Sequence, residues 1–360
     1  MDHLDALRGI AVLGVVMVHS AMVNNRLLPL PHRVAWVAGS GQRGVALFFV
    51  VSAFTLFLSH DNRKGERRPI LNFFIRRFFR LAPMFYVAIA ISRFFLPQVT
   101  GPPSHILLAI LFLNGLHPFT INHGAAGGWS VADEALFYAC LPFLFARIKS
   151  LKAALIWALV GATVGHFVAH RLGWKYPQYG DFFTFFSFSA SLPIFLLGIL
   201  GYFIWKDLIV GSRMPETARR TISALLLVLA LVSYFTLLPF NYETLYQESM
   251  VGLFLLLSLS LHSWSILVNP ATRILGKISF SVYLLHFVVF FAVKAWIARS
   301  VGIHPFLSSP MVQFAGCFAV TLAVTLPLAY LTWRWIEEPG IRAGRRLIAR
   351  LESKENMAAV

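Results

Sequence analysis

Long apolar runs, separated by short polar and mostly basic segments, recur along the whole chain. A helix needs about 20 predominantly apolar residues to cross the hydrocarbon layer of a bilayer, and runs such as 222–238 and 311–330 approach that length. The pattern predicts ten spans, at residues 5–23, 43–59, 81–97, 129–146, 151–170, 187–205, 219–238, 247–265, 276–298 and 310–333. We therefore expect an all-α polytopic membrane protein.

Composition agrees with this prediction and excludes a water-soluble domain. Of the 360 residues, 58% are hydrophobic and 13% are charged, whereas roughly a quarter are charged in a soluble domain. The two cysteines, Cys140 and Cys317, lie inside apolar runs, which indicates neither a disulfide framework nor a metal site. The first apolar run lacks a small-residue cleavage site, so we expect a retained first helix.

The distribution of basic residues predicts the orientation. With the N-terminus in the cytoplasm, the segments between spans hold 22 Lys and Arg residues inside and 6 outside. This asymmetry follows the positive-inside rule and places both termini in the cytoplasm. The net charge of +16 therefore indicates contact with anionic lipid headgroups rather than with nucleic acid.

One further apolar segment, residues 104–119, complicates the count. A full crossing there would invert every later loop and place most basic loops outside. We therefore expect a re-entrant or lying segment, whose backbone needs protein or water partners. Residues 1–339 form one transmembrane domain in this interpretation, followed by a basic cytoplasmic tail at 340–360.

Arg8 and His19 are ionisable residues within the first predicted span, where such residues are costly and mark candidate sites. Eleven residues bring both side chains to one helix face, about 16 Å apart along the axis. The alternative is structural, with Arg8 extending to the interface and His19 bonded to a backbone carbonyl.

Arg76, Arg77 and Arg80 end the first predicted cytoplasmic loop, directly before a span. They are typical of a positive-inside anchor. The alternative is functional: guanidinium groups match phosphate oxygens, and the cluster lies on the side where a cytoplasmic polyphosphate ligand such as coenzyme A would bind.

Two adjacent carboxylates, Asp133 and Glu134, stand at the predicted outer mouth of a span, close to Trp129, Ser130 and Tyr138. Such a pair is hard to explain as packing. The carboxylates either pair with a basic residue, orient an acceptor hydroxyl, or hold a catalytic imidazole in the correct tautomer.

A polar stripe follows late in the chain, where Gly276, Ser279, Tyr283 and His286 recur at helical spacing. The stripe predicts close helix packing at its small residues, and His286 is the member most suited to line a cavity. The last span ends at residues 333–339 with aromatic residues, acidic residues and a proline, which indicates a structural terminus.

Together these residues resemble the motifs of the membrane-bound acyltransferase 3 family. The matching elements, in chain order, are Arg8 with His19, residues 48–54 around Ser52 with Ala53 at a usual glycine, Arg76-Arg77-Phe78-Phe79-Arg80, Trp129-Ser130 through Glu134 and Tyr138 with Val131 at a usual leucine, Gly276 through His286, and Ile336-Glu337-Glu338-Pro339. They run in order from residue 4 to residue 339, and their combination is specific although each alone is weak.

The resemblance implies about ten transmembrane helices in a bacterial inner membrane and acyl transfer from a cytoplasmic donor, usually acetyl coenzyme A, with no permanently bound cofactor and no metal. It also implies a glycan or glycolipid acceptor, such as exopolysaccharide, O-antigen or a lipo-oligosaccharide. Many members carry a fused extracytoplasmic domain. We expect none in residues 1–360, so that the chain either completes the transfer or passes the acyl group to a separate extracytoplasmic transferase.

The resulting hypothesis gives each candidate a role. Arg76, Arg77 and Arg80 bind the phosphates of coenzyme A, and the pantetheine arm passes Arg8 to place the thioester beside His19. His19 acts as base or as acyl carrier, and Glu134, with Asp133 beside it, orients His19 or the acceptor. The further candidate cavity residues are Ser52, Trp129, Ser130, Tyr138, Ser279, Tyr283 and His286.

Two functions of other classes are the alternatives. A transporter or flippase for a glycan or lipid predicts broken helices in two matching halves, and the sequence has no such symmetry. A non-catalytic membrane scaffold leaves Arg8 and His19 unexplained. Release of free coenzyme A from a thioester distinguishes the enzyme from both.

Overall fold

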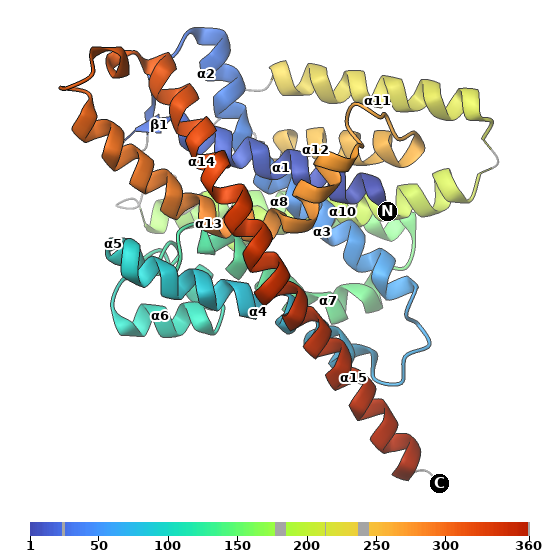
Figure 1. The fold of residues 1–360 in the computed structure, drawn as a ribbon. Coiled ribbons are helices and arrows are strands. Elements are labelled where there is room, and N and C mark those ends of the chain that lie inside the picture. Colours follow the sequence, from blue (N-terminus) through green and yellow to red (C-terminus); the bar gives the residue numbers. More distant parts are fainter. Residues whose placement is uncertain (24–25, 177–184, 213, 237–244, 359–360) are drawn as a thin grey trace.

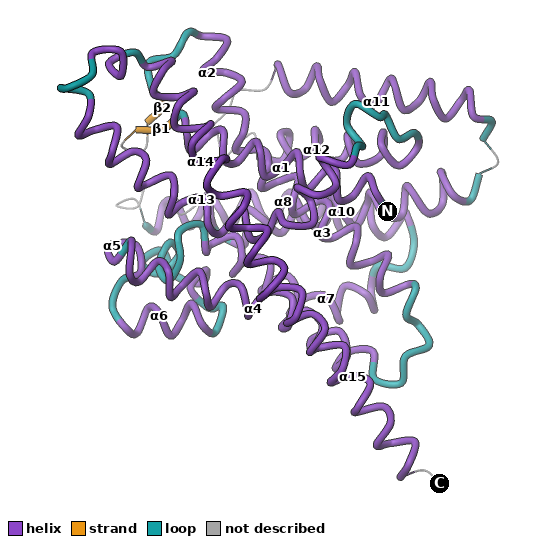
Figure 2. The backbone as a smooth tube through the Cα atoms, viewed as in Figure 1, coloured by secondary structure: helices purple, strands orange, loops and turns teal. Residues whose placement is uncertain are grey.

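The computed structural model describes the backbone of residues 1–23, 26–176, 185–212, 214–236 and 245–358. Within these residues the chain is almost entirely helical (Figure 2), and its strands are limited to a hairpin of β1 (Met22–Val23) and β2 (Arg26–Leu27). The predicted all-α class is confirmed.

The predicted spans correspond to long helices. Nine helices in the described part of the chain have the length and apolar composition needed to cross a membrane, and α12 is shorter but also apolar. The helices at the ten predicted spans are α1 (Asp2–Ser20), α3 (Arg43–Asp61), α4 (Pro69–Phe95), α7 (Gly128–Arg147), α8 (Leu151–Lys175), α10 (Phe188–Ile204), α11 (Glu216–Thr236), α12 (Leu245–Leu261), α13 (Pro270–Ser300) and α14 (Pro310–Thr332). The predicted fold class, an all-α polytopic membrane protein, is thereby confirmed.

The remaining elements are short connections, except for the 21-residue C-terminal helix α15 (Glu338–Ala358). The short connections are α2 (His32–Gly39), η1 (Ser40–Gln42), α5 (Pro97–Thr100), α6 (Pro103–Ile110), η2 (Asn114–Leu116), η4 (Trp205–Val210), η6 (Pro305–Ser308) and η7 (Trp333–Glu337). The segment 104–119 is thus one eight-residue helix followed by turns. Because eight residues rise only about 12 Å, this segment is too short for a full crossing. A re-entrant path for it stays a prediction.

Helix α4 begins earlier than expected. The sequence predicts a cytoplasmic loop up to residue 80, but the helix starts at Pro69 and includes Arg76, Arg77 and Arg80. Proline is favoured at the first helical position, and arginine is a good helix former, so the helix extends beyond the apolar run that marks the span. As a result, the helix fixes the direction in which each of the three arginines leaves the backbone.

Helix α1 lies in the middle of the bundle and packs against α13 and α3 (Figure 1). The contact with α13 is close at Gly9 and Gly276, where an added Cβ would collide with the carbonyls of Thr272 and Asp5. The predicted small-residue notch at Gly276 is thereby confirmed, and it brings the polar stripe of α13 against α1.

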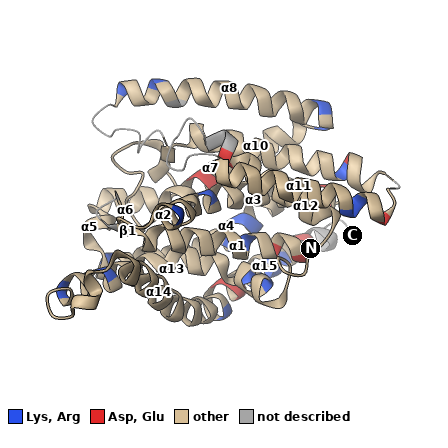
Figure 3. Ribbon diagram, turned by 90° about the horizontal axis from the view of Figure 1, so that it is seen from above, with Lys and Arg blue, Asp and Glu red and all other residues tan. Residues whose placement is uncertain are grey.

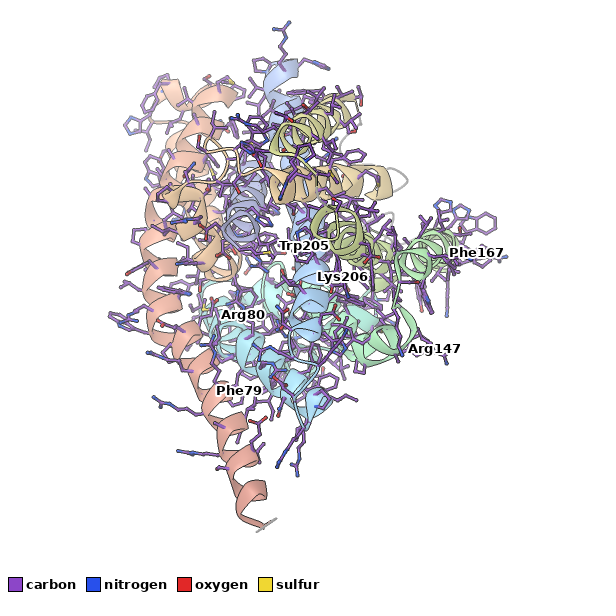
Figure 4. All side chains as sticks on the ribbon, turned by 90° about the vertical axis from the view of Figure 1, so that its right-hand side faces the viewer. Phe79, Arg80, Arg147, Phe167, Trp205 and Lys206 are labelled. Carbon is purple, nitrogen blue, oxygen red and sulfur yellow. The ribbon has the colours of Figure 1, made fainter. Side chains whose placement is uncertain are left out.

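Helices α8 and α11 are peripheral and bury little of their apolar surface. Seen from above, α8 is set apart from the bundle and carries its charges near its two ends (Figure 3). Phe167 on α8, which is 58% exposed, lies at the outer edge of the molecule (Figure 4). An exposed apolar surface with polar ends is what a lipid-facing helix requires.

Helices α14, η7 and α15 follow one another without a break, so that the C-terminal end projects from the bundle (Figure 1). Gly344 of α15 lies against Phe79 of α4. The predicted tail is therefore helical as far as residue 358, and residues 359–360 lie outside the described residues. The predicted loops 171–186 and 239–246 also lie partly outside them.

Candidate active site

A cavity of about 260 Å³ opens between α1, α3, α4, α7 and α13. Its lining residues are Arg8, Val45, Phe48, Phe49, Ser52, Thr55, Leu56, Arg77, Arg80, Leu81, Ser130, Val131, Glu134, Tyr138, Ser279, Phe280 and Tyr283. Residues from five helices that are distant in sequence thus converge on one space. Most of the motifs found in the sequence supply at least one side chain to it.

Three arginines give the cavity a positive character. Arg8 of α1 bonds through Nη1 to Asp5 at 3.3 Å and donates from Nη2 to Thr55 Oγ1 at 3.0 Å. Arg77 and Arg80 come from one face of α4, and Arg80 lies in the interior of the bundle (Figure 4). Guanidinium groups converging on one cavity favour an anionic ligand.

Arg80 is held by a carboxylate from the segment 333–339, which the sequence predicts to be a structural terminus and which carries the last of the family motifs. Glu337, which is fully buried, forms an ion pair with Arg80 and accepts a hydrogen bond from Ser281 at 3.0 Å. Because a buried carboxylate needs such partners, Glu337 joins η7, α4 and α13 and fixes the direction of Arg80. The available signal was an acidic residue directly after an apolar span.

Arg77 has a different environment. Its guanidinium lies over the rings of Phe73 and Tyr138, 5.7 and 5.8 Å from the centroids. Its buried Nε has no hydrogen-bond partner among the described residues. Arg77 therefore has donor capacity left for a ligand.

Arg76 does not line the cavity in the described structure. It forms a two-bond ion pair with Glu66, at 2.9 and 3.0 Å, because a rotation of about 100° per residue turns it away from Arg77. Burial raises the pKa of Glu66, and hydrogen bonds from Arg76 and Arg63 lower it. The lowering is the larger effect, so the pKa of Glu66 lies below its ordinary value.

Glu134 faces the cavity and Asp133 does not. Glu134 Oε1 accepts hydrogen bonds from Ser52 Oγ and Tyr138 OH, both at 2.6 Å. Asp133 is fully buried on another face of α7, close to Gly115. Of the two predicted carboxylates, Glu134 is thus the one placed to contact a ligand.

Hydroxyl groups line the other side of the cavity. Ser130 Oγ donates to Tyr283 OH at 2.7 Å, and Tyr283 OH donates to the carbonyl of Gly127 at 3.0 Å. Gly127 has a positive φ of 73°, which glycine adopts without strain. Ser279 also lines the cavity and donates to the Gly276 carbonyl at 2.8 Å. These bonds tie the turn before α7 to α13.

Trp129 packs beside the cavity instead of lining it. Its ring lies edge-on to Phe49, with 6.2 Å between centroids, and 4.4 Å from the ring of Phe186. Trp129 is thus brought close to the other candidates but has a packing role in this arrangement.

His19 contacts His286 rather than Glu134. His19 Nδ1 lies 2.8 Å from the carbonyl of Val15 and 3.2 Å from His286 Nε2. His286 is fully buried, and its Nδ1 lies 2.6 Å from the carbonyl of Tyr283. Neither histidine is among the residues that line the cavity, and His286 is joined to that lining through Tyr283.

Comparison with known proteins agrees with this collection of residues. A family model described as an acyltransferase domain, Acyl_transf_3, matches residues 1–330. The chain belongs to the acyltransferase 3 family. It is a multi-pass membrane protein that carries an acyltransferase domain of this family, and the family predicted from the motifs is confirmed.

The curated relatives are longer proteins. A Staphylococcus aureus (strain MSSA476) protein named "Putative O-acetyltransferase SAS0844" is 24% identical over 96% of this chain and 58% of its own length. The O-acetyltransferase OatA of S. aureus (strain MRSA252) is 22% identical over 99% of this chain and 60% of its own length. The chain thus spans about three fifths of these relatives. No solved structure matches it.

Proposed function

We propose that this acyltransferase is an O-acetyltransferase of the bacterial inner membrane. It transfers an acetyl group from cytoplasmic acetyl coenzyme A to a hydroxyl of a glycan or glycolipid. The observation that carries the proposal is the cavity on which Arg8, Arg77 and Arg80 converge beside the Glu134 carboxylate. The relatives named as O-acetyltransferases support the acetyl group and the oxygen acceptor.

The arginines bind the donor. Coenzyme A carries several phosphate charges, and guanidinium groups form charge-assisted hydrogen bonds with phosphate oxygens. Arg77 and Arg80 receive these phosphates at the predicted cytoplasmic side, and Arg8 binds along the arm that leads to the thioester. The pair between Arg76 and Glu66 leaves Arg76 outside this set, as a residue that stabilises the start of α4.

The transfer step needs a base and exchanges one acyl bond for another. His19 takes the proton of the acceptor hydroxyl. The hydroxyl oxygen attacks the carbonyl carbon of the thioester, and a C–O bond forms. The tetrahedral intermediate collapses with cleavage of the C–S bond. The leaving thiolate takes the proton from His19, which yields the ester and free coenzyme A. Glu134 orients the acceptor through its remaining oxygen.

The test uses purified protein in liposomes with acetyl-labelled coenzyme A and a panel of cell-envelope glycans. We expect label transfer together with stoichiometric release of free coenzyme A. His19→Ala should abolish both, because it removes the proposed base. Arg77→Ala should raise the KM for acetyl coenzyme A about tenfold to a hundredfold, the effect of losing one or two charge-assisted hydrogen bonds.

Arg76→Ala is the matched control, since it removes an arginine one position away that is paired outside the cavity. Its KM for acetyl coenzyme A should equal that of the wild type. An active His19→Ala variant would contradict the assignment of His19 as the base. A covalent acetyl group trapped on His19 would show that His19 carries the acyl group instead. Glycan or lipid movement without thioester cleavage would support the transporter instead.

A further inference from the structure

The contact between His19 and His286 joins α1 and α13 inside the bundle. The two rings lie 5.1 Å apart between centroids, and the joining atoms are His19 Nδ1 and His286 Nε2, at 3.2 Å. The ring of Phe287 lies 4.5 Å from that of His19 and 4.1 Å from that of His286. Two histidines are thus packed in one apolar environment, where each ring nitrogen needs a defined partner.

The carbonyl partners determine which nitrogens carry protons. A carbonyl oxygen only accepts hydrogen bonds. His286 Nδ1, at 2.6 Å from the Tyr283 carbonyl, must therefore be the protonated nitrogen of that ring. His19 Nδ1, at 2.8 Å from the Val15 carbonyl, must carry a proton for the same reason.

The remaining two nitrogens then follow. In a neutral ring with a proton on Nδ1, Nε2 has a free lone pair, so His286 Nε2 accepts the hydrogen bond from His19 Nδ1. A proton on His286 Nε2 would point at the proton on His19 Nδ1 and break the contact. His19 Nε2 keeps its own lone pair, and no described residue donates a hydrogen bond to it.

We propose that His286 is a positioning residue that holds the His19 ring with its Nε2 lone pair free, so that His19 Nε2 is the reacting atom of the acyltransferase. The proposal rests on the catalytic role proposed for His19. It gives His286, through a neutral imidazole, the role that a carboxylate has beside many catalytic histidines.

A second function of the contact appears when His19 takes the proton of the acceptor. The ring then becomes an imidazolium with protons on both nitrogens, and its Nδ1–H donates more strongly to the Val15 carbonyl and to His286 Nε2. Charge-assisted hydrogen bonds are roughly twice as strong as neutral ones. His286 therefore stabilises the charged state of His19, and it does so without adding a buried charge to the resting protein.

The surroundings keep His286 in place. Its Nδ1–H bond to the Tyr283 carbonyl is within one helix, and Tyr283 itself is bonded to Gly127 and Ser130. An added Cβ at Gly127 would meet the ring of Phe287, so the turn before α7 packs directly on the residue next to His286. The direction of the imidazole is thus linked to the same bonds that build the cavity wall.

The first experiment reads the protons directly and needs no turnover. Full-length protein with ¹⁵N-labelled histidine is placed in nanodiscs, and the signals of His19 and His286 are assigned by their loss in His19→Phe and His286→Phe. We expect both rings to be neutral and protonated on Nδ1, with a hydrogen bond from His19 Nδ1 to His286 Nε2. Protonation of His19 on Nε2 would overturn the proposal.

The second experiment compares turnover in His286→Phe and His286→Gln. Phenylalanine keeps a ring but has no acceptor, so kcat should fall on the order of 100-fold, within the range of base catalysis, while the KM for acetyl coenzyme A stays unchanged. The Gln side-chain oxygen reaches the position of Nε2 and accepts a hydrogen bond, so this variant should recover at least a tenth of the wild-type kcat.

The control is His105→Phe, which breaks the other close histidine pair of the described chain, where the Nδ1 atoms of His105 and His123 lie 3.0 Å apart. We expect wild-type kcat. Equal losses in His286→Phe and His286→Gln, or a change confined to KM, would refute the positioning role. An inactive wild-type protein with the expected nitrogen signals would refute the proposed function and leave the hydrogen-bond assignment intact.

Discussion

At the scale of single residues, the cavity depends on how its charges are partnered. Arg8 bonds to Asp5 and Thr55, Arg80 is paired with Glu337, and Arg77 contacts aromatic rings. Ion pairs that are buried respond strongly to the loss of one partner, whereas exposed pairs contribute little. The two adjacent carboxylates Glu337 and Glu338 represent both cases and allow a direct comparison.

Glu337→Gln should destabilise the protein by about 1–3 kcal/mol, because Arg80 then keeps its charge without the opposing carboxylate. Glu338→Gln should change stability by less than about 0.5 kcal/mol, since Glu338 pairs with Arg334 at an exposed i, i+4 position. Thermal unfolding of both variants in the same detergent measures the difference. Equal melting temperatures would show that the pair between Arg80 and Glu337 contributes nothing to stability.

The residues that the sequence identified are those whose type is unusual in a membrane, such as Arg8, His19 and Glu134. Which residues form pairs was less predictable. Glu337 is distant in the chain from its partner Arg80, and His286 is distant from His19. A pattern along one helix shows which residues share its face. It does not show which neighbouring helix that face meets.

At the scale of helices, the length of the apolar runs predicted the spans well. It did not predict where a helix starts when its first turns are polar. The start of α4 at Pro69 was missed because its first turns are polar and basic. The notch of α13 was predicted from Gly276, because small residues have one clear use where helices approach closely. Which helix fills that notch required the tertiary structure.

Gly276→Ala and Gly316→Ala should have opposite effects on stability. Alanine at Gly276 places a Cβ against the backbone of Asp5, and such overpacking costs about 1–3 kcal/mol. At Gly316 an added Cβ meets nothing within 4 Å, so the better helix propensity of alanine should contribute up to about 1 kcal/mol. Thermal unfolding in detergent checks both signs, and stabilisation by Gly276→Ala would contradict the close contact of α1 with α13.

The loop before α4 should give the protein an acid-sensitive contact. The pKa of Glu66 lies below its ordinary value in the folded protein, so its contribution to stability is present above the unfolded pKa, about 4.3. That contribution is lost as the pH falls through the lower folded pKa. The melting temperature should therefore fall less between neutral and acidic pH for Glu66→Gln than for the wild type. An equal fall in both proteins would exclude Glu66 as a source of acid sensitivity.

At the scale of the whole molecule, the bundle has two ends of different character. Loop 62–68 and α15 lie at one end, and the hairpin and η6 lie at the other (Figure 1). The charge distribution predicts that the first end faces the cytoplasm. This orientation remains a prediction, because the fold fixes the ends relative to each other and not relative to the cell.

Single cysteines test the orientation. Gly65 and Gly302 are suitable positions, since an added Cβ meets nothing within 4 Å at either. In a background with Cys140 and Cys317 replaced by alanine, a membrane-impermeant maleimide should label Gly302→Cys in intact cells and Gly65→Cys only after permeabilisation. The reverse pattern would invert the assigned topology and place the arginine cavity at the outer face.

The convergence of three guanidinium groups on one cavity has an energetic consequence for the protein alone. Arg8, Arg77 and Arg80 repel one another, and among the described ion pairs Arg8 and Arg80 each have a carboxylate partner whereas Arg77 has none. An anion that enters relieves the repulsion, so donor binding should tighten the bundle as well as begin the reaction. At a hundredfold excess over Kd, any such ligand stabilises a protein by about 2.7 kcal/mol. Desulfo-coenzyme A, which has the phosphates but no thioester, should therefore raise the melting temperature of the wild type more than that of Arg77→Ala.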